Sequence, residues 1–102
     1  MQLNEADKAE IKNEIVCQLR NEAEISKIVI FGSFISEMSP NDLDVAIFQT
    51  SSESYMPLAV KYRTKLISVA RRIPIDVIPV RSNPEKSKFL DKILAGEVVY
   101  EK

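Results

Sequence analysis

Two aspartates at the start of an apolar segment are the residues of this sequence best placed to do chemistry. Asp42 and Asp44 are two positions apart, and the apolar residues Val45–Phe48 follow them. Side chains alternate between the two faces of a strand, so an extended backbone places both carboxylates on one face. Two like charges side by side repel each other unless a positive charge lies between them. The spacing therefore predicts a divalent cation site, and carboxylate oxygens suit a hard cation such as Mg²⁺.

A third aspartate interrupts another apolar segment. Asp76 is the one charged residue within Ile75–Ile78. It could complete an acidic cluster with Asp42 and Asp44, or accept the proton of an incoming hydroxyl near the metal. Clusters of this kind hold one or two Mg²⁺ ions, which stabilise the attacking and leaving oxygens of a phosphoryl displacement. A pair of aspartates alone is weak evidence for a metal, and the third carboxylate strengthens it.

A Gly-Ser turn precedes these aspartates. The β-rich run Ile28–Phe31 predicts a strand, which Gly32 ends and Ser33 follows. A glycine lets the backbone approach a phosphate closely, and a serine at the start of a helical turn offers its hydroxyl and free N–H groups. Taken alone, such a pair is usually only a turn. Together with the carboxylates, Gly32 and Ser33 become candidates for phosphate binding.

The composition removes most other chemistry. The chain has no histidine and one cysteine, Cys17. A Ser-His-Asp or Cys-His mechanism within this chain is therefore excluded, and a structural zinc site is not expected. A single cysteine cannot form an internal disulfide, which favours a reducing compartment. Catalysis would depend on carboxylates, Lys, Arg, Tyr or hydroxyl groups.

Length and charge are those of one small globular domain. The 102 residues are 45% hydrophobic and 28% charged, with a net charge of −1, so we expect a single domain over residues 1–102. This charge balance gives no strong sign of nucleic acid binding. The first residues show no signal-peptide pattern, and no apolar run approaches the ~20 residues of a membrane span. We therefore expect a cytoplasmic protein that does not enter a membrane.

Apolar periodicity predicts the elements that must position these residues. Helices are expected over residues 4–23 and 57–72 and from Pro84 to Gly96, and strands over 27–31, 43–48 and 75–78, with a short final strand over 98–100. Asn4 is the expected N-cap of the first helix. Pro79 either ends the third strand or places it at a sheet edge.

The expected fold class is α/β (α+β), a small mixed sheet of three to four strands with helices packed on it. The first two strands are joined by only about ten residues, which favours antiparallel neighbours. A long helix joins the second and third strands, which favours a parallel, right-handed crossover. These connections bring Gly32, Ser33, Asp42, Asp44 and Asp76 to the same edge of the sheet.

Basic residues gather on the predicted helix over residues 57–72. Lys61, Lys65 and Arg72 lie near one face, and Arg71 is adjacent. They could reach an anionic substrate or partner. More often such residues form the solvated side of an amphipathic helix.

Taken together, these motifs resemble those of the minimal nucleotidyltransferases, a family with the DNA polymerase β-like nucleotidyltransferase fold. The family pattern is an apolar strand, Gly-Ser, a short helical turn, Asp-x-Asp at the start of the next strand, and an aspartate on a later strand. The resemblance covers nearly the whole chain. It implies that Gly32 and Ser33 hold the phosphates of a nucleotide. Asp42 and Asp44 would bind Mg²⁺, with Asp76 as the third ligand or the base.

The resemblance also implies a reaction. A nucleoside monophosphate, most often AMP from ATP, is transferred to an acceptor hydroxyl, and pyrophosphate is released. In small members the acceptor is often a partner protein, and some pair with a helical HEPN-domain protein as antitoxin to toxin. Many members have an arginine and a second glycine after Gly-Ser, whereas this chain has Phe34-Ile35-Ser36-Glu37.

Three hypotheses about function stay open at this point. The first is a Mg²⁺-dependent nucleotidyltransferase that modifies a hydroxyl, on a HEPN-type partner protein. The second is a non-catalytic binding or antitoxin module that masks such a partner, which a phosphate loop without arginine keeps open. The third is a structural homodimer domain with an incidental acidic edge. The three aspartates favour the first.

Overall fold

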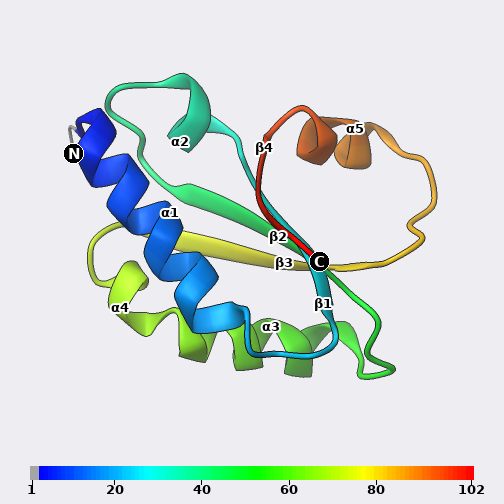
Figure 1. Cartoon of the computed structure of the whole chain (residues 1–102). Coiled ribbons are helices and arrows are strands. Elements are labelled where there is room, and N and C mark those ends of the chain that lie inside the picture. The colour runs from blue at the N-terminus through cyan, green and yellow to red at the C-terminus, as the bar shows by residue number, and fades with distance from the viewer. Residues whose placement is uncertain (1–2) are drawn as a thin grey trace.

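The chain folds into a four-stranded mixed sheet with helices on both faces (Figure 1). The computed structural model describes residues 3–102. In chain order the elements are α1 (Glu5–Leu19), β1 (Ile25–Phe31), α2 (Ser33–Ser36), β2 (Leu43–Gln49), α3 (Tyr55–Lys65), α4 (Ile67–Ala70), β3 (Ile75–Arg81), α5 (Lys88–Leu94) and β4 (Glu97–Glu101). The predicted fold class is confirmed. None of the helices in residues 3–102 has the length and apolar character that a membrane span requires.

The strand order of the sheet is β3-β2-β1-β4. β1 is antiparallel to both β2 and β4, whereas β2 and β3 are parallel. Both predicted pairings are thus confirmed, because the short link makes an antiparallel pair and the helical crossover makes a parallel one. β3 and β4 are the edge strands.

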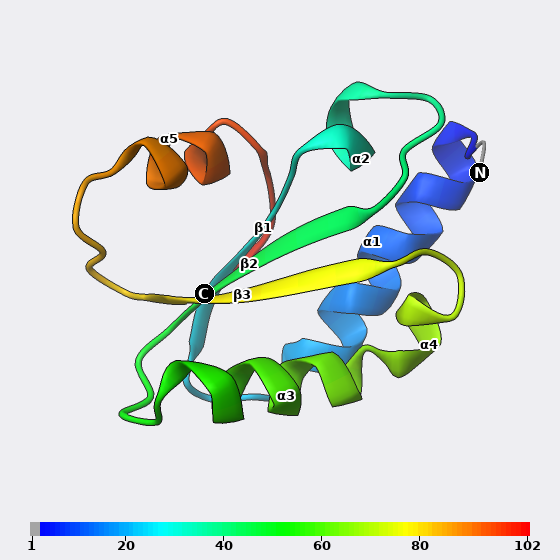
Figure 2. The ribbon, with the colours of Figure 1, turned by 180° about the vertical axis from the view of Figure 1, so that it is seen from behind.

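Helices cover the two faces of the sheet unequally. Figures 1 and 2 show α1, α3 and α4 on one side of the sheet and α5 on the other. Along β2, Val45 and Ile47 face the larger core under α1 and α3, while Ala46 faces a smaller core with Leu90 and Ile93 of α5. Because a buried aliphatic side chain contributes ~1.5–3 kcal/mol, this alternation determines which face of β2 packs against α1 and α3 and which packs against α5.

The first helix is shorter than predicted. α1 begins after Asn4, whose side chain accepts the N–H of Asp7, as expected of the N-cap. It ends at Leu19 rather than at residue 23, and the next N–H groups form turns, with Glu22 N–H donating to the Leu19 carbonyl at 3.0 Å. These turns redirect the chain so that Ile25 enters the sheet fully buried. Helical spacing continues past Leu19 in the sequence, so periodicity alone could not locate this end.

The helix predicted over residues 57–72 begins earlier and is divided. α3 begins at Tyr55, and the helical path breaks at Leu66, whose backbone φ and ψ are −101° and 20°. The N–H of Leu66 is shared between the carbonyls of Tyr62 and Arg63, both at 3.1 Å. Leu66 is nevertheless fully buried, as are Tyr62 before the break and Val69 after it. The apolar periodicity that predicts this helix is therefore confirmed, although the helix is not continuous.

The last helix begins later than predicted. α5 begins at Lys88 rather than at Pro84, because the Ser87 hydroxyl accepts the N–H of Leu90 at 3.0 Å and so supplies the N-cap. β3 continues through Pro79, which is tolerated because β3 pairs on one side only. The predicted short final strand is confirmed as β4, which pairs with β1.

Three basic residues of the long crossover, Lys61, Lys65 and Arg72, form ion pairs within the chain. The Lys61 ammonium lies 3.2 Å from Glu22 and 3.1 Å from Glu24, and Lys65 lies 3.7 Å from Glu22. The Arg72 guanidinium lies 2.7 Å from Glu10 of α1. These three residues thus tie α3 and the turn after α4 to α1 and the segment that follows it, which favours a structural role over an anion-binding one.

Glu24, which pairs with Lys61, also accepts a hydrogen bond from a buried hydroxyl that we expect to stabilise the fold. Tyr62 is fully buried and its hydroxyl donates to Glu24 at 2.8 Å. Tyr62→Phe removes this donor, and we expect it to lower the free energy of unfolding by ~1–2 kcal/mol. A thermal melt should then show a fall of roughly 4–8 °C per kcal/mol. Tyr55→Phe, at an exposed position of the same helix, is the matched control, and an equal effect of both substitutions would contradict this account.

Candidate active site

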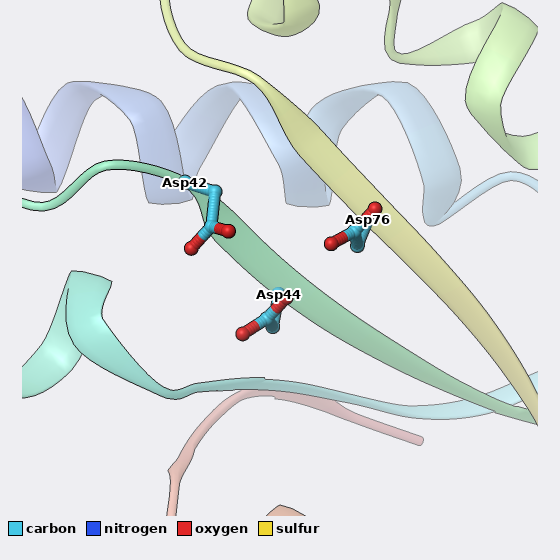
Figure 3. Close-up of side chains that lie close together, drawn as sticks. All are labelled: Asp42, Asp44 and Asp76. Atoms are coloured by element: carbon cyan, nitrogen blue, oxygen red, sulfur yellow. The ribbon is translucent and has the colours of Figure 1, made fainter.

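The three aspartates lie together at the end of the sheet where β2 and β3 begin, which is the edge predicted from the sequence. Asp42 directly precedes β2, Asp44 lies in β2 and Asp76 lies in β3 (Figure 3). Each offers a carboxylate oxygen, and these oxygens all lie within 4.8 Å of one another. The predicted convergence of the three side chains is therefore observed, and their role as metal ligands stays a prediction.

The register of the parallel pair explains this convergence. Leu43 pairs with Ile75 and Asp44 pairs with Asp76. The Leu43 N–H donates to the Pro74 carbonyl at 2.9 Å, which starts the ladder. Leu43 and Ile75 are both buried in the larger core, so the next residue of each strand points to the opposite face. Hydrophobic burial of one pair thus forces the two carboxylates to lie side by side.

Burial and repulsion between the carboxylates together shift the pKa of the middle one, Asp44. Burial raises the pKa of Asp44 above its ordinary value, and the charges of Asp42 and Asp76 and a hydrogen bond with Asp76 raise it further. The Lys92 ammonium on α5 acts in the opposite direction. A cluster in which one carboxylate resists ionisation is suited to a bound cation, because the cation removes the repulsion and replaces the proton.

Gly32 is required beside this cluster. Its backbone has φ 81° and ψ −153°, a conformation that essentially only glycine adopts. A Cβ at this position would lie 2.5 Å from Asp44 Oδ2. The glycine therefore lets the end of β1 pass directly against the carboxylate of Asp44, and its proximity to the acidic cluster was predicted from the sequence.

Ser33 lies beside Asp42, at the start of α2. Its hydroxyl is 3.5 Å from both the backbone carbonyl and the Oδ1 atom of Asp42, which makes these contacts weak. The hydroxyl is thus available to another partner. α2 itself is anchored by Phe34, which is fully buried in the larger core. From Ser33 to Asp42 the sequence contains no basic residue.

α5 brings two further residues to this edge, and the sequence reasoning missed both. Phe31 pairs with Asp44 in the sheet, and its ring meets the ring of Phe89 edge to face, with centroids 6.1 Å apart. Lys92 follows Phe89 by one helical turn and is the cation that acts on Asp44. No sequence signal could have found them, because nearly fifty residues separate Lys92 from Asp44.

The fold and the acidic cluster define the class of polymerase β-like nucleotidyltransferases. The family model described as Polymerase beta, Nucleotidyltransferase matches residues 13–102, and the chain belongs to this family. No curated protein is significantly similar to the chain.

Solved structures show which members of the class the fold is similar to. A chain of the toxin–antitoxin complex MntA–HepT matches with a TM-score of 0.63 and 20% identity over 92% of this chain and 73% of that chain. A chain from the structure of a tri-AMPylated Shewanella oneidensis HEPN toxin in complex with MNT antitoxin matches with a TM-score of 0.66 and 20% identity. The match covers 93% of this chain and 73% of that chain. A toxin–antitoxin complex with AMP-PNP matches with a TM-score of 0.65 and 21% identity over 89% and 73%. The structural similarity is thus to chains of toxin–antitoxin complexes, and at this sequence identity it shows a shared fold.

Proposed function

We propose that this protein is a Mg²⁺-dependent nucleotidyltransferase that transfers AMP from ATP to a hydroxyl of a HEPN-type partner protein, as the antitoxin of a cytoplasmic toxin–antitoxin pair. The observation that carries the proposal is the cluster of Asp42, Asp44 and Asp76, whose carboxylate oxygens lie within 4.8 Å of one another. Three carboxylates at this spacing suit a hard divalent cation. Membership of the nucleotidyltransferase family supports the reaction class.

The chemistry follows from the charges at the sheet edge. Asp42, Asp44 and Asp76 would hold Mg²⁺, which supplies positive charge to the reacting phosphoryl group when bound. The acceptor oxygen bonds to the α-phosphorus of ATP, and the bond from this phosphorus to the pyrophosphate oxygen breaks. The acceptor proton needs a base. Asp76 is the candidate because its carboxylate is the exposed member of the cluster. Gly32 and Ser33 would contact the phosphates at the end of β1.

The nature of the acceptor is supported by the structural neighbours. One of them contains a tri-AMPylated HEPN toxin bound to an MNT antitoxin, and another contains AMP-PNP. Both neighbours share the fold of this chain at about a fifth sequence identity. We therefore propose a protein acceptor of the HEPN type and an adenine nucleotide donor.

A non-catalytic antitoxin that masks its partner is the second candidate. The observation that favours it is the absence of a basic residue between Ser33 and Asp42, where a triphosphate would need positive charge. In this case the acidic cluster would survive without turnover, and inhibition of the toxin would depend on contact alone. Either candidate function is compatible with a homodimer of this chain.

Transfer of label from ATP separates these candidates. We expect the purified protein, mixed with its HEPN-type partner, Mg²⁺ and α-labelled ATP, to place label on the partner. The double variant Asp42→Asn/Asp44→Asn should lower this transfer on the order of 10³-fold, because loss of two ligands removes several kcal/mol of charge stabilisation. Label in the partner's electrophoretic band measures the transfer. Mass spectrometry of the partner should show one added adenylyl group per modified hydroxyl.

The controls identify what a negative result means. Asp91→Asn makes the same chemical change on the exposed side of α5 and should leave transfer unchanged. Transfer that survives the double substitution would remove the metal site from the mechanism. If no label is transferred but both the wild type and the double variant still bind and inhibit the toxin, masking is the function.

A further inference from the structure

An apolar groove lies between β3 and α5. Its volume is about 370 Å³, and its lining contains the apolar side chains of Ile78, Val80, Phe89, Leu90 and Ile93 beside polar residues that include Arg81 and Glu85. Ile78 and Val80 pack against the smaller core and are only partly buried. Phe89 is 49% exposed. The groove therefore presents apolar surface that the chain itself leaves uncovered.

One end of the groove, at Ile78, lies close to the acidic cluster along β3. Ile78 follows Asp76 by two residues on the same face of β3, a separation of about 7 Å along a strand. On the other side of the groove, Phe89 contacts Phe31, and Phe31 pairs with Asp44. The apolar surface and the carboxylates are thus parts of one continuous face of the sheet.

This arrangement fits a ligand with one anionic end and one flat apolar end. The cluster with its cation would take the anionic end, and the distance along β3 from Asp76 to Ile78 and Val80 is comparable with that from a phosphate to the base of a nucleotide. Aromatic side chains bind bases through their ring faces, whatever the base. Phe89 supplies such a ring at the mouth of the groove, and half of its surface is free.

We propose that the groove between β3 and α5 binds the base of the nucleoside triphosphate and that Phe89 stacks on this base. The inference deepens the proposed function and rests on it, since it assigns the part of the donor nucleotide that lies away from the phosphates. An extended peptide along the free edge of β3 is the competing occupant, and it would not require the ring of Phe89.

Binding measurements with and without the base test this assignment. The probes are Mg²⁺-ATP and Mg²⁺-tripolyphosphate, which has no base or ribose, titrated by calorimetry into the wild type and Phe89→Ala. We expect Phe89→Ala to weaken Mg²⁺-ATP binding about 10-fold or more, in line with the value of one base–aromatic contact. Binding of Mg²⁺-tripolyphosphate should stay unchanged.

Two further variants make the result specific. Phe89→Tyr keeps the ring and should retain Mg²⁺-ATP affinity. Leu94→Ala removes an equally exposed apolar side chain from the same helix, 54% against 49%, and should affect neither probe. Thermal melts without ligand verify that all variants are folded.

The possible outcomes separate this inference from the proposed function. If Phe89→Ala weakens the binding of both probes equally, or of neither, the base site is overturned even if AMP transfer is intact. Selective loss of Mg²⁺-ATP binding supports the base site even if no partner is modified. A wild type that binds neither probe contradicts both. Mg²⁺-ATP binding that does not depend on Phe89 favours the extended peptide as the occupant of the groove.

Discussion

Asp44→Asn is expected to stabilise the metal-free protein and to abolish its response to Mg²⁺. Burial and the charges of Asp42 and Asp76 raise the pKa of Asp44, so the ionised carboxylate is unfavourable in the folded state. The amide removes this charge, and we expect an increase of about 1 kcal/mol or less in the free energy of unfolding, because solvent screens a partly exposed group. Mg²⁺ affinity should fall by at least about 100-fold. Thermal melts with and without Mg²⁺ measure both effects.

The pH dependence of the metal-free protein should show the same carboxylate. The pKa of Asp44 lies above its ordinary value of 3.8 in the folded state, so folding favours the protonated form. The stability that this group contributes is full below about pH 3.8 and is lost as the pH rises through the raised value. Asp44→Asn should lack this component. Saturating Mg²⁺ should reverse the loss in the wild type, by ~2.7 kcal/mol at 100 times the dissociation constant.

Asp91→Asn is the control for both experiments. It removes an exposed carboxylate of α5 and should leave the Mg²⁺-induced stabilisation unchanged. An Asp44→Asn protein that is less stable than the wild type without metal, or that is still stabilised by Mg²⁺, would contradict the electrostatic account of the cluster.

Gly32→Ala is expected to damage the fold and the metal site together. The new Cβ would lie 2.5 Å from Asp44 Oδ2, and the residue would keep a φ of 81° that alanine rarely adopts. We expect a loss of about 2–4 kcal/mol in the free energy of unfolding, from backbone strain and overpacking. Relaxation of the clash must displace Asp44, so the remaining folded protein should bind Mg²⁺ at least about 10-fold more weakly.

Ser36→Ala on the same helical turn provides the comparison. Its hydroxyl makes one long bond, 3.4 Å to the Gly32 carbonyl, and it is exposed, so little change in stability or Mg²⁺ affinity is expected. A Gly32→Ala protein with wild-type stability and affinity would show that the close approach of β1 to Asp44 is not required.

Much of the fold could be predicted because local patterns and connection lengths act in the same direction. The apolar run Val45–Phe48 predicts β2, and the short link before it favours an antiparallel partner, as the pairing with β1 shows. The main errors are the ends of the helices, the break inside the predicted 57–72 helix and the length of β3. α1 ends at Leu19 and α3 breaks at Leu66 because the chain must turn there to keep Ile25 and Val69 buried. Such turns satisfy tertiary packing and leave no mark in the local periodicity.

The candidate site divides in the same way. The type and spacing of Asp42 and Asp44, the isolated Asp76 and the Gly-Ser turn were sufficient to predict that these groups meet at one sheet edge. The spacing of residues along a strand decides the face on which each side chain lies, and the strand direction decides the end of the sheet at which it lies. The sequence could not reveal how closely Gly32 approaches Asp44. A Cβ at position 32 would clash with the Asp44 carboxylate, so no other residue fits there.

The sequence by itself thus determined the chemistry available to this protein: no histidine, three carboxylates at strand starts, and a nucleotidyltransferase pattern. Tertiary structure alone decided what surrounds them. α5 follows the acidic residues by a long stretch of chain, and only its packing on the smaller core brings Phe89 and Lys92 to the cluster. The physical reason is that strand alternation is a local property of the backbone, whereas the groove and the local charge arise from side chains that meet only after the sheet and helices pack.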